Sequence, residues 1–422
     1  MAGWMTSTVV GAHLDALAAA HANFCTRSGP ADWAPGQAGA TSGYVKIAAT
    51  TAGSPTSRWG VLLTGGVHAR ELAPPDALVS FLEKLATAYL ASSAIVYPSW
   101  TDPVNSIVYD SFTIPWPWVR KVVESLDLYV APLVNPDGRD FARAPVSAAE
   151  QELHKEWRKN RRPAPAGNPN PLAVGVDLNR NFDVVWDFNR FFDVAKAGVE
   201  SSTSPADEMF IGPSAESEPE TKNVAGLMRN KEISFYIDFH AFSRDILYSW
   251  GLDTNQSTDA TQTFTNAAWD HRRDGTKNTA YAEYIPAIDD AVHQAMGKRI
   301  SDLIFTRGGG SDPRAQARSR YTIKPSAELY VTSGASDDYC FSRWFTAAIA
   351  KSPIRRVMAF TIEVGGDPKD GPDHDEGGFT PNYVTQYPKL EREIHLAAWA
   401  FLTAVASLSV EAPSAPAPPG SP

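Results

Sequence analysis

Cysteine is nearly absent from this sequence, which holds only Cys25 and Cys340 among 422 residues. Two cysteines can build neither a disulfide framework nor a zinc site made of thiolates. We expect both side chains to be buried free thiols, and a single disulfide between them is the open alternative.

Basic charge and long apolar runs are also scarce. The chain has 38 Lys and Arg against 48 Asp and Glu, a net charge of −10. This balance argues against nucleic acid or an anionic membrane as the main partner.

No apolar run approaches the roughly 20 residues of a membrane span. Residues 1–24 resemble a helix rather than a signal peptide, so the expected compartment is cytoplasmic for a complete chain and secreted for a trimmed one.

We expect one domain over residues 1–408, because no internal repeat and no dividing linker occurs. Residues 160–171 and 307–314 are rich in proline or glycine and are expected to be surface excursions. Residues 409–422 are rich in proline, alanine and serine, a composition that is typical of disorder.

Strand-like and helix-like stretches alternate, which predicts an α/β fold with a largely parallel or mixed sheet. The expected strands are residues 60–67, 126–134, 234–239 and 357–362. A helix is expected after His68, with Pro74 and Pro75 in its first turn. Residues 135–138, Asn-Pro-Asp-Gly, predict a turn, and Ser217 to Glu220 predict a capping box that opens a helix.

Three of these strands lead into a polar side chain that can bind metal or carry a proton. They are followed by His68 (with Glu71 three residues later), His240 and Glu363. Sites in open α/β sheets form where strands end. The other seven histidines lie in polar or helical contexts, and we interpret them as structural or exposed.

His68, Glu71 and His240 together predict a catalytic metal site. The pattern H-x-x-E is weak alone, but here a strand and Gly65-Gly66 precede it and a helix follows it. Two histidines and one glutamate suit zinc in a tetrahedral site with one open position. Zinc in such a site activates water for hydrolysis.

Residues 176–182, Val-Asp-Leu-Asn-Arg-Asn-Phe, hold further candidates. Asp177 in an apolar stretch needs a partner. Either a contact to a zinc-bound histidine or a turn or capping role would supply one. Asn179 and Arg180 could bind a carboxylate. Tyr330 precedes a loop of small residues that is suited to a mobile flap, although composition alone favours a core position for it.

Eight motifs in a fixed order resemble those of zinc metallocarboxypeptidases of the A/B type, over roughly residues 10–405. They are GGVHARE (65–71), APLVNPDG (131–138), EWRKNR (156–161), GVDLNRNF (175–182), FIGPSAESEPET (210–221), DFHAFSRDILYSWG (238–251), LYVTSGASDDY (329–339) and FTIEVGG (360–366). The resemblance implies a mixed twisted sheet between helices, one zinc ion, and peptide or protein C-termini as substrate.

The resemblance also implies a role for each matching residue. His68, Glu71 and His240 would be zinc ligands, Glu363 the general base, and Arg158 the group that polarises the scissile carbonyl. Asn179 and Arg180 would bind the C-terminal carboxylate, Tyr330 would close over it, and Arg70 would bind substrate further out.

Asp337 is the residue from which we infer specificity. In the family, the seventh residue after the flap tyrosine forms the floor of the pocket for the C-terminal side chain, and an acid there implies preference for Lys or Arg. Dual basic and apolar preference, or an Asp337 that points to solvent, are the alternatives.

The chain departs from the family pattern at three points. The interval of 169 residues between Glu71 and His240 is long, with extra length expected in 160–174 and 186–209. Ala241-Phe242 replace a common Ser-Tyr pair. The usual N-terminal prosegment is absent, which weighs against secretion as a zymogen.

Three other functions compete with this interpretation. A deacylase of the aspartoacylase type shares the ligand pattern but lacks the later motifs. A peptidoglycan-directed amidase or peptidase on the same fold is harder to exclude. A non-catalytic binding domain is disfavoured because every expected zinc ligand and the base are present.

Overall fold

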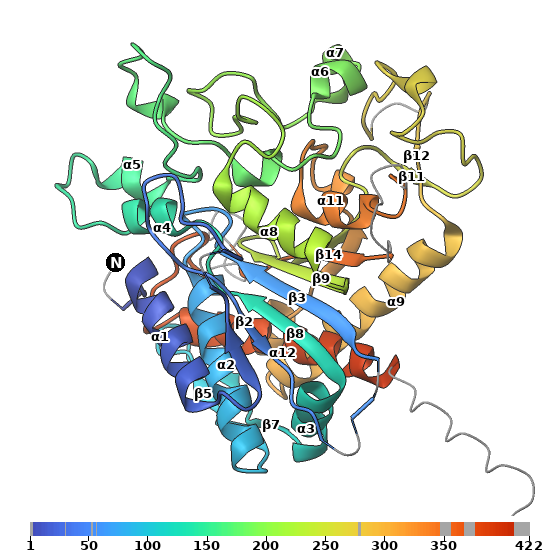
Figure 1. Cartoon of the computed structure of the whole chain (residues 1–422). Coiled ribbons are helices and arrows are strands. Elements are labelled where there is room, and N and C mark those ends of the chain that lie inside the picture. The colour runs from blue at the N-terminus through green and yellow to red at the C-terminus, as the bar shows by residue number, and fades with distance from the viewer. Residues whose placement is uncertain are drawn as a thin grey trace, which may run out of the picture.

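The computed structural model describes residues 3–29, 31–51, 54–55, 57–276, 280–346, 356–366 and 376–408. The predicted tail, 409–422, lies outside these residues. A mixed sheet of eight strands forms the centre of the molecule (Figure 1). Its order across the sheet is β1 (Cys25–Arg27), β2 (Val45–Ile47), β8 (Leu126–Ala131), β3 (Trp59–Gly65), β9 (Ile233–His240), β14 (Met358–Glu363), β10 (Asp245–Tyr248) and β13 (Thr322–Pro325).

The four central strands, β8, β3, β9 and β14, are parallel to one another, whereas β2 and β10 pair antiparallel with their inner neighbours. Central strands of this kind are buried on both faces, which explains their continuous apolar sequences. The predicted α/β class with a mixed sheet is therefore confirmed.

Three small two-stranded ladders lie outside the main sheet: β4 (Ile95–Tyr97) with β7 (Phe112–Ile114), β5 (Trp100–Thr101) with β6 (Val108–Tyr109), and β11 (Asn255–Gln256) with β12 (Glu283–Tyr284).

Helices cover both faces of the sheet. Leu63 and Ile237 belong to a core shared with α1 (Ser7–Ala20), α2 (Ala73–Leu90), α3 (Trp116–Ser125), α9 (Ala287–Leu303) and α12 (Tyr387–Leu408). Leu62 and Tyr236, their neighbours in sequence, belong to the opposite core with α8 (Pro219–Asn230) and α11 (Ser336–Ser342). Successive strand residues point to opposite faces, so one strand supplies both cores.

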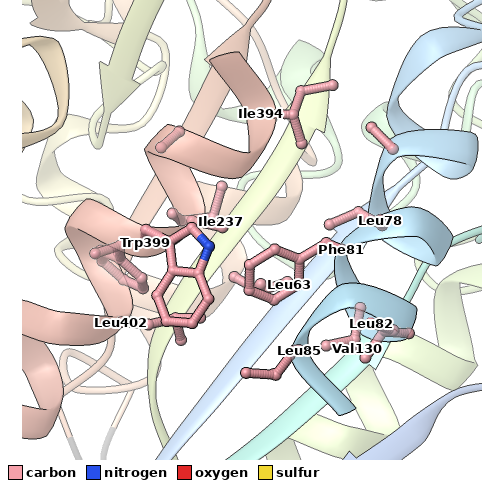
Figure 2. Close-up of a cluster of buried hydrophobic side chains, with 14 of the residues drawn as sticks. Leu63, Leu78, Phe81, Leu82, Leu85, Val130, Ile237, Ile394, Trp399 and Leu402 are labelled. Atoms are coloured by element: carbon pink, nitrogen blue, oxygen red, sulfur yellow. The ribbon is translucent and has the colours of Figure 1, made fainter. Parts of the chain in front are cut away.

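The larger core is built where α2 and α12 pack together over the sheet (Figure 2). Phe81 of α2 faces Trp399 of α12, with ring centroids 5.5 Å apart. Leu78, Phe81, Leu82 and Leu85 of α2 share one face of the helix, and all four are buried. Within the described residues, no helix is long and apolar enough to cross a membrane.

The remaining helices are short and lie in the connections. They are α4 (Pro136–Ala142), α5 (Gln151–Lys155), α6 (Phe188–Phe191), α7 (Val194–Ala197) and α10 (Pro313–Arg318), with single turns at η1 (Pro171–Ala173), η2 (Leu178–Arg180), η3 (Ala267–Trp269), η4 (Ile304–Gly308) and η5 (Ser326–Glu328). Cys25 and Cys340 are buried and unpaired, as expected.

Two local predictions about the starts of helices were wrong. The predicted turn at 135–138 instead opens α4, where the Asn135 side chain accepts a hydrogen bond from Gly138 N at 2.9 Å. The predicted capping box also does not form. Glu218 precedes α8 without a side-chain cap, and Ser217 donates to Glu218 Oε1 at 2.6 Å.

The two expected surface excursions are only partly exposed. Most of residues 163–172 are exposed, but Asn160 is buried and bonded to Glu218 and Glu220. Gly308 and Gly309 are also buried. A Cβ on Gly309 would lie 2.7 Å from both Gln316 Cα and Phe305 O, so this position is a close backbone contact rather than a loop tip.

Candidate active site

The end of β3 delivers His68 and Glu71 to the edge of the sheet. Backbone pairing continues beyond the strand, because Asn135 N donates to Gly66 O at 3.0 Å. Gly66 has φ +63°, and a Cβ there would lie 2.7 Å from Pro75 Cγ. A glycine is therefore required for the chain to turn tightly from strand toward helix. The turn folds His68 and Glu71 toward one point, with His68 Nδ1 2.6 Å from Glu71 Oε1.

His240 ends β9, the neighbour of β3, and completes a cluster with these two residues. Its Nδ1 lies 3.2 Å from His68 Nδ1 and 3.1 Å from Glu71 Oε2. One donor atom from each of the three buried residues lies within 4.8 Å of the others. The three predicted ligands are thus brought together.

The donor set fits a zinc ion. Each histidine turns its other ring nitrogen to a buried carboxylate: His68 Nε2 lies 3.3 Å from Asp177 Oδ1, and His240 Nε2 lies 3.0 Å from Asp238 Oδ2. A carboxylate there favours a proton on Nε2 and leaves the Nδ1 lone pair for a metal. Two imidazole nitrogens and one carboxylate form a common catalytic zinc site.

The electrostatic environment of Glu71 and His240 also favours a bound cation. Burial opposes ionisation of Glu71, but His68 and His240 outweigh it and hold the pKa of this carboxyl below its usual range. Burial likewise opposes protonation of His240, yet Asp238 and Glu71 raise its pKa well above its usual range. These carboxylates therefore stabilise positive charge where the two Nδ1 atoms meet.

Asp177 connects three parts of the site. Its Oδ1 lies near His68 and accepts a hydrogen bond from Asn179 N at 3.0 Å, while its Oδ2 accepts one from Arg158 Nε at 2.8 Å. Burial opposes its charge, but Arg158 and His68 lower its pKa well below the usual range. Both roles considered for Asp177, partner of a histidine and cap of a turn, are present together.

Asp238 is a site residue that the sequence analysis missed. It lies two positions before His240 on the same face of β9, and its side chain accepts hydrogen bonds from Thr64 Oγ1 at 2.8 Å and Ser336 Oγ at 2.9 Å. The signal that could have revealed it is the one used for Asp177, a carboxylate inside an apolar strand.

Glu363 and Arg158 flank the three ligands. β14 pairs with β9 so that Glu363 lies beside His240. Ala69 N donates to Arg158 O at 3.0 Å, which holds the Arg158 segment against the turn that carries the ligands. Among the described residues, Glu363 Oε2 and Arg158 Nη2 are buried without a hydrogen-bond partner. Burial raises the pKa of Glu363 to about 8, against the opposing effect of His240.

Asn179, Arg180 and Tyr330 form a second group. The Arg180 guanidinium lies over the Tyr330 ring, 5.7 Å from its centroid. Asn179 Oδ1 accepts a hydrogen bond from Ser336 N at 2.8 Å, which joins this group to α11. Tyr330 is 36% exposed, so the core position that composition favoured for it is wrong.

The predicted flap is held in place after its tyrosine. Residues 331–336 are buried, Thr332 N donates to Gly251 O at 2.8 Å, and Gly334 N donates to Val184 O at 3.0 Å. Beyond Tyr330, which is exposed, the backbone of this loop is therefore fixed by contacts to other segments.

Asp337 and Arg70 are both buried. Asp337 is 2% exposed and accepts a hydrogen bond from Ser326 Oγ at 2.8 Å, so the alternative in which it points to solvent is wrong. Arg70 lies 4.0 Å from the centroid of the Phe379 ring and donates to Glu208 at 2.9 Å. Its expected contact with substrate stays a prediction.

Comparison with known proteins identifies a family from the sequence and related folds among solved structures. A family model described as zinc carboxypeptidase matches residues 15–387. Human carboxypeptidase B is 32% identical over 229 residues, which cover 53% of this chain and 40% of that protein. Rat mast cell carboxypeptidase A is 29% identical over 196 residues, 46% of this chain and 36% of that protein. The chain thus spans well under half the length of these curated relatives.

Solved structures share the fold at low sequence identity. Bovine thrombin-activatable fibrinolysis inhibitor, solved with a tick carboxypeptidase inhibitor, has a TM-score of 0.61 at 18% identity and covers 96% of this chain and 98% of its own. Carboxypeptidase A from Helicoverpa armigera also has a TM-score of 0.61, at 19% identity, covering 96% of this chain and 73% of its own. Together with the family model, the ordered motifs and the sheet show that the chain belongs to the zinc carboxypeptidase family.

Proposed function

We propose that this chain is a zinc-dependent metallocarboxypeptidase that removes C-terminal amino acids from peptides. The observation that carries the proposal is the cluster of His68, Glu71 and His240, with Glu363 at the end of the adjacent strand. Zinc bound there would supply Lewis acidity and lower the pKa of water toward about 7.

The side chains around the cluster suit hydrolysis of a peptide bond. Glu363 acts as general base, because its unpartnered Oε2 can take the proton of the attacking water. It then delivers that proton to the nitrogen of the departing amino acid. Arg158 Nη2, also unpartnered, donates to the carbonyl oxygen as negative charge develops there. The Asp177 carboxylate holds Arg158 by its Nε and leaves the Nη2 group free for this task.

Asn179, Arg180 and Tyr330 select the free C-terminus. A guanidinium binds a carboxylate through two parallel hydrogen bonds, and Arg180 is placed beside a tyrosine that is partly exposed. Binding this carboxylate fixes which peptide bond reaches Glu363 and Arg158. Substrates without a free terminal carboxylate should therefore be poor.

Asp337 gives the enzyme a basic or dual basic and apolar preference. Its carboxyl group is buried, and its pKa is raised chiefly by burial. A buried acid of this kind is stabilised by a cationic partner. A C-terminal Lys or Arg side chain would supply that partner, whereas an apolar side chain could be accepted with the acid protonated.

Hydrolysis of a panel of N-blocked dipeptides that differ in their C-terminal residue tests the proposal. We expect turnover that a chelator abolishes and added zinc restores. Matched dipeptide amides serve as the control for the terminal carboxylate. Cleavage of the amides with no cleavage of the acids would favour an amidase instead.

A further inference from the structure

Residues 199–211, here called the 199–211 segment, contact both halves of the predicted carboxylate site. Glu200 O accepts a hydrogen bond from Arg180 Nε. Glu200 N donates to Val331 O at 2.8 Å, next to Tyr330. The carbonyl group of Glu200 therefore contacts Arg180, and its N–H group contacts the loop that begins at Tyr330.

The next residue repeats the connection through side chains. Ser201 Oγ lies 2.8 Å from Ser333 Oγ, and Ser333 is completely buried. A buried hydroxyl is costly to leave without a partner. The Ser201 hydroxyl therefore fixes the distance between the 199–211 segment and the loop that follows Tyr330.

The orientation of Arg180 depends on the same segment. Its Nη1 donates to Asn179 O at 2.7 Å, and its Nη2 contacts the sulfur of Met209 at 3.9 Å. Methionine sulfur is a weak acceptor. Glu200 O thus fixes the guanidinium at Nε, while Nη2 keeps the capacity to bind a stronger acceptor such as a carboxylate.

The 199–211 segment also contacts Asp177, which lies beside the predicted zinc ligand His68. Ser202 N donates to Met209 O and Ile211 N donates to Ser202 O, both at 3.0 Å, which closes the segment on itself. Asp177 N donates to Phe210 O at 2.9 Å. Hydrogen bonds at both ends of the segment therefore connect it to Asp177 and to the loop that follows Tyr330.

We propose that the 199–211 segment positions the carboxylate-binding group, with Ser201 as its positioning residue through the Ser201–Ser333 hydroxyl pair. This inference rests on the proposed function, because it assigns a role toward the substrate's terminal carboxylate. Ser201 does not touch the reacting atoms. Its loss should weaken recognition of a carboxylate and leave the chemical step nearly unchanged.

Ser201→Ala tests this inference by the split between KM and kcat. We expect KM for N-blocked dipeptides to rise about fivefold, the effect of one hydrogen bond, while kcat changes less than about twofold. Calorimetric binding of N-acetyl-phenylalanine and of its amide gives a readout that needs no turnover. The preference for the acid over the amide should fall by the same factor.

Three variants control the experiment. Ser201→Thr keeps a hydroxyl and should retain wild-type preference. Ser202→Ala removes a hydroxyl whose partner, in the described part of the chain, is Ser204 N of the same segment at 3.1 Å, and should also retain that preference. The double variant Ser201→Ala with Ser333→Ala removes both hydroxyls of the pair, so neither is left without its partner, and should lose preference as Ser201→Ala does.

The outcomes separate this inference from the proposed function. Wild-type protein that cleaves no dipeptide contradicts the proposed function. Ser201→Ala with wild-type KM and an unchanged preference for acid over amide overturns the inference, even if its melting temperature falls. An equal loss in Ser202→Ala also overturns it.

Discussion

The buried carboxylates around His68, Glu71 and His240 are suited to different tasks because they have different partners. Asp177 is shared by Arg158, His68 and Asn179, whereas Glu363 has an oxygen without a partner among the described residues. A fully bonded carboxylate is suited to orienting other groups, and an unbonded one is suited to moving a proton.

Glu363→Gln should retain the fold and the bound zinc but lose nearly all turnover. The amide cannot take a proton from water, and loss of a general base typically costs about 10² to 10⁴-fold in rate. Dipeptide turnover, with zinc content and melting temperature measured on the same sample, checks this. Near-wild-type turnover would remove Glu363 from the mechanism.

Asp337→Ala should reduce kcat/KM for a C-terminal Arg substrate more than for a Phe substrate, with a Glu substrate as a third reference. The lost carboxylate is the group expected to pair with the substrate cation. Ser326→Ala is the matched control, because it removes only the 2.8 Å hydrogen bond to this carboxyl. A wild type that prefers Phe, with an unchanged ratio in Asp337→Ala, would show that the pocket is assigned wrongly.

At the scale of elements, the ends of the strands identified the candidate ligands because only local information was needed. Apolar runs followed by His68, His240 and Glu363 are visible in the sequence, and the parallel pairing of β3, β9 and β14 brings them together. Asp238 has the local signal of a carboxylate inside an apolar strand, but its partners, Thr64 and Ser336, come from distant segments and could not be predicted from the sequence.

Element boundaries were harder to predict where tertiary contacts decide them. The sequence 135–138 favours a turn, yet it opens α4 because Asn135 also donates to Val67 O at 3.1 Å and is held by that bond. The roles of Arg158, Arg70 and Tyr330 came from the family resemblance alone. Nothing in their local sequence distinguishes them from structural residues.

The packing of α2 against α12 should contribute to stability without affecting the site. Phe81 is 1% exposed and contacts Trp399 (Figure 2). It also contacts His395, with ring centroids 5.6 Å apart. We expect Phe81→Ala to lower the free energy of unfolding by about 3–5 kcal/mol, the usual range for such a cavity. Denaturant unfolding measures this change, and Tyr330→Phe, at a partly exposed position, is the control. An effect below about 1 kcal/mol would contradict this packing.

At the scale of the whole molecule, the order of the strands is what the sequence could not supply. The candidate ligands follow β3 or end β9, and these two strands are adjacent in the sheet although β4 to β8 and α2 to α8 lie between them in the sequence. The 199–211 segment is a further case. It occupies the expected excess length, but its contacts to Arg180 and Val331 depend on the complete fold.

The stability of the molecule should fall as the pH drops below neutral. Burial lowers the pKa of His293 to about 4, from the ordinary value of 6.5. The unfolded chain therefore binds this proton first between pH 6.5 and about 4, and the free energy of unfolding decreases as pH falls through that window. One such group contributes at most about 1.4 kcal/mol per pH unit.

Unfolding free energies measured across that window should show a smaller slope in His293→Gln than in the wild type. His271→Gln, at an exposed position, should keep the wild-type slope. The same slope in all three proteins would mean that His293 does not contribute to the acid sensitivity.

The most direct test of the account is the zinc content of the purified protein, compared between wild type, His240→Ala and Glu363→Gln. We expect one zinc per chain in wild type and in Glu363→Gln, and loss of that zinc in His240→Ala, because of the two substituted residues only His240 belongs to the three-residue cluster. An unchanged zinc stoichiometry in His240→Ala would contradict the proposed metal site, and with it the proposed function.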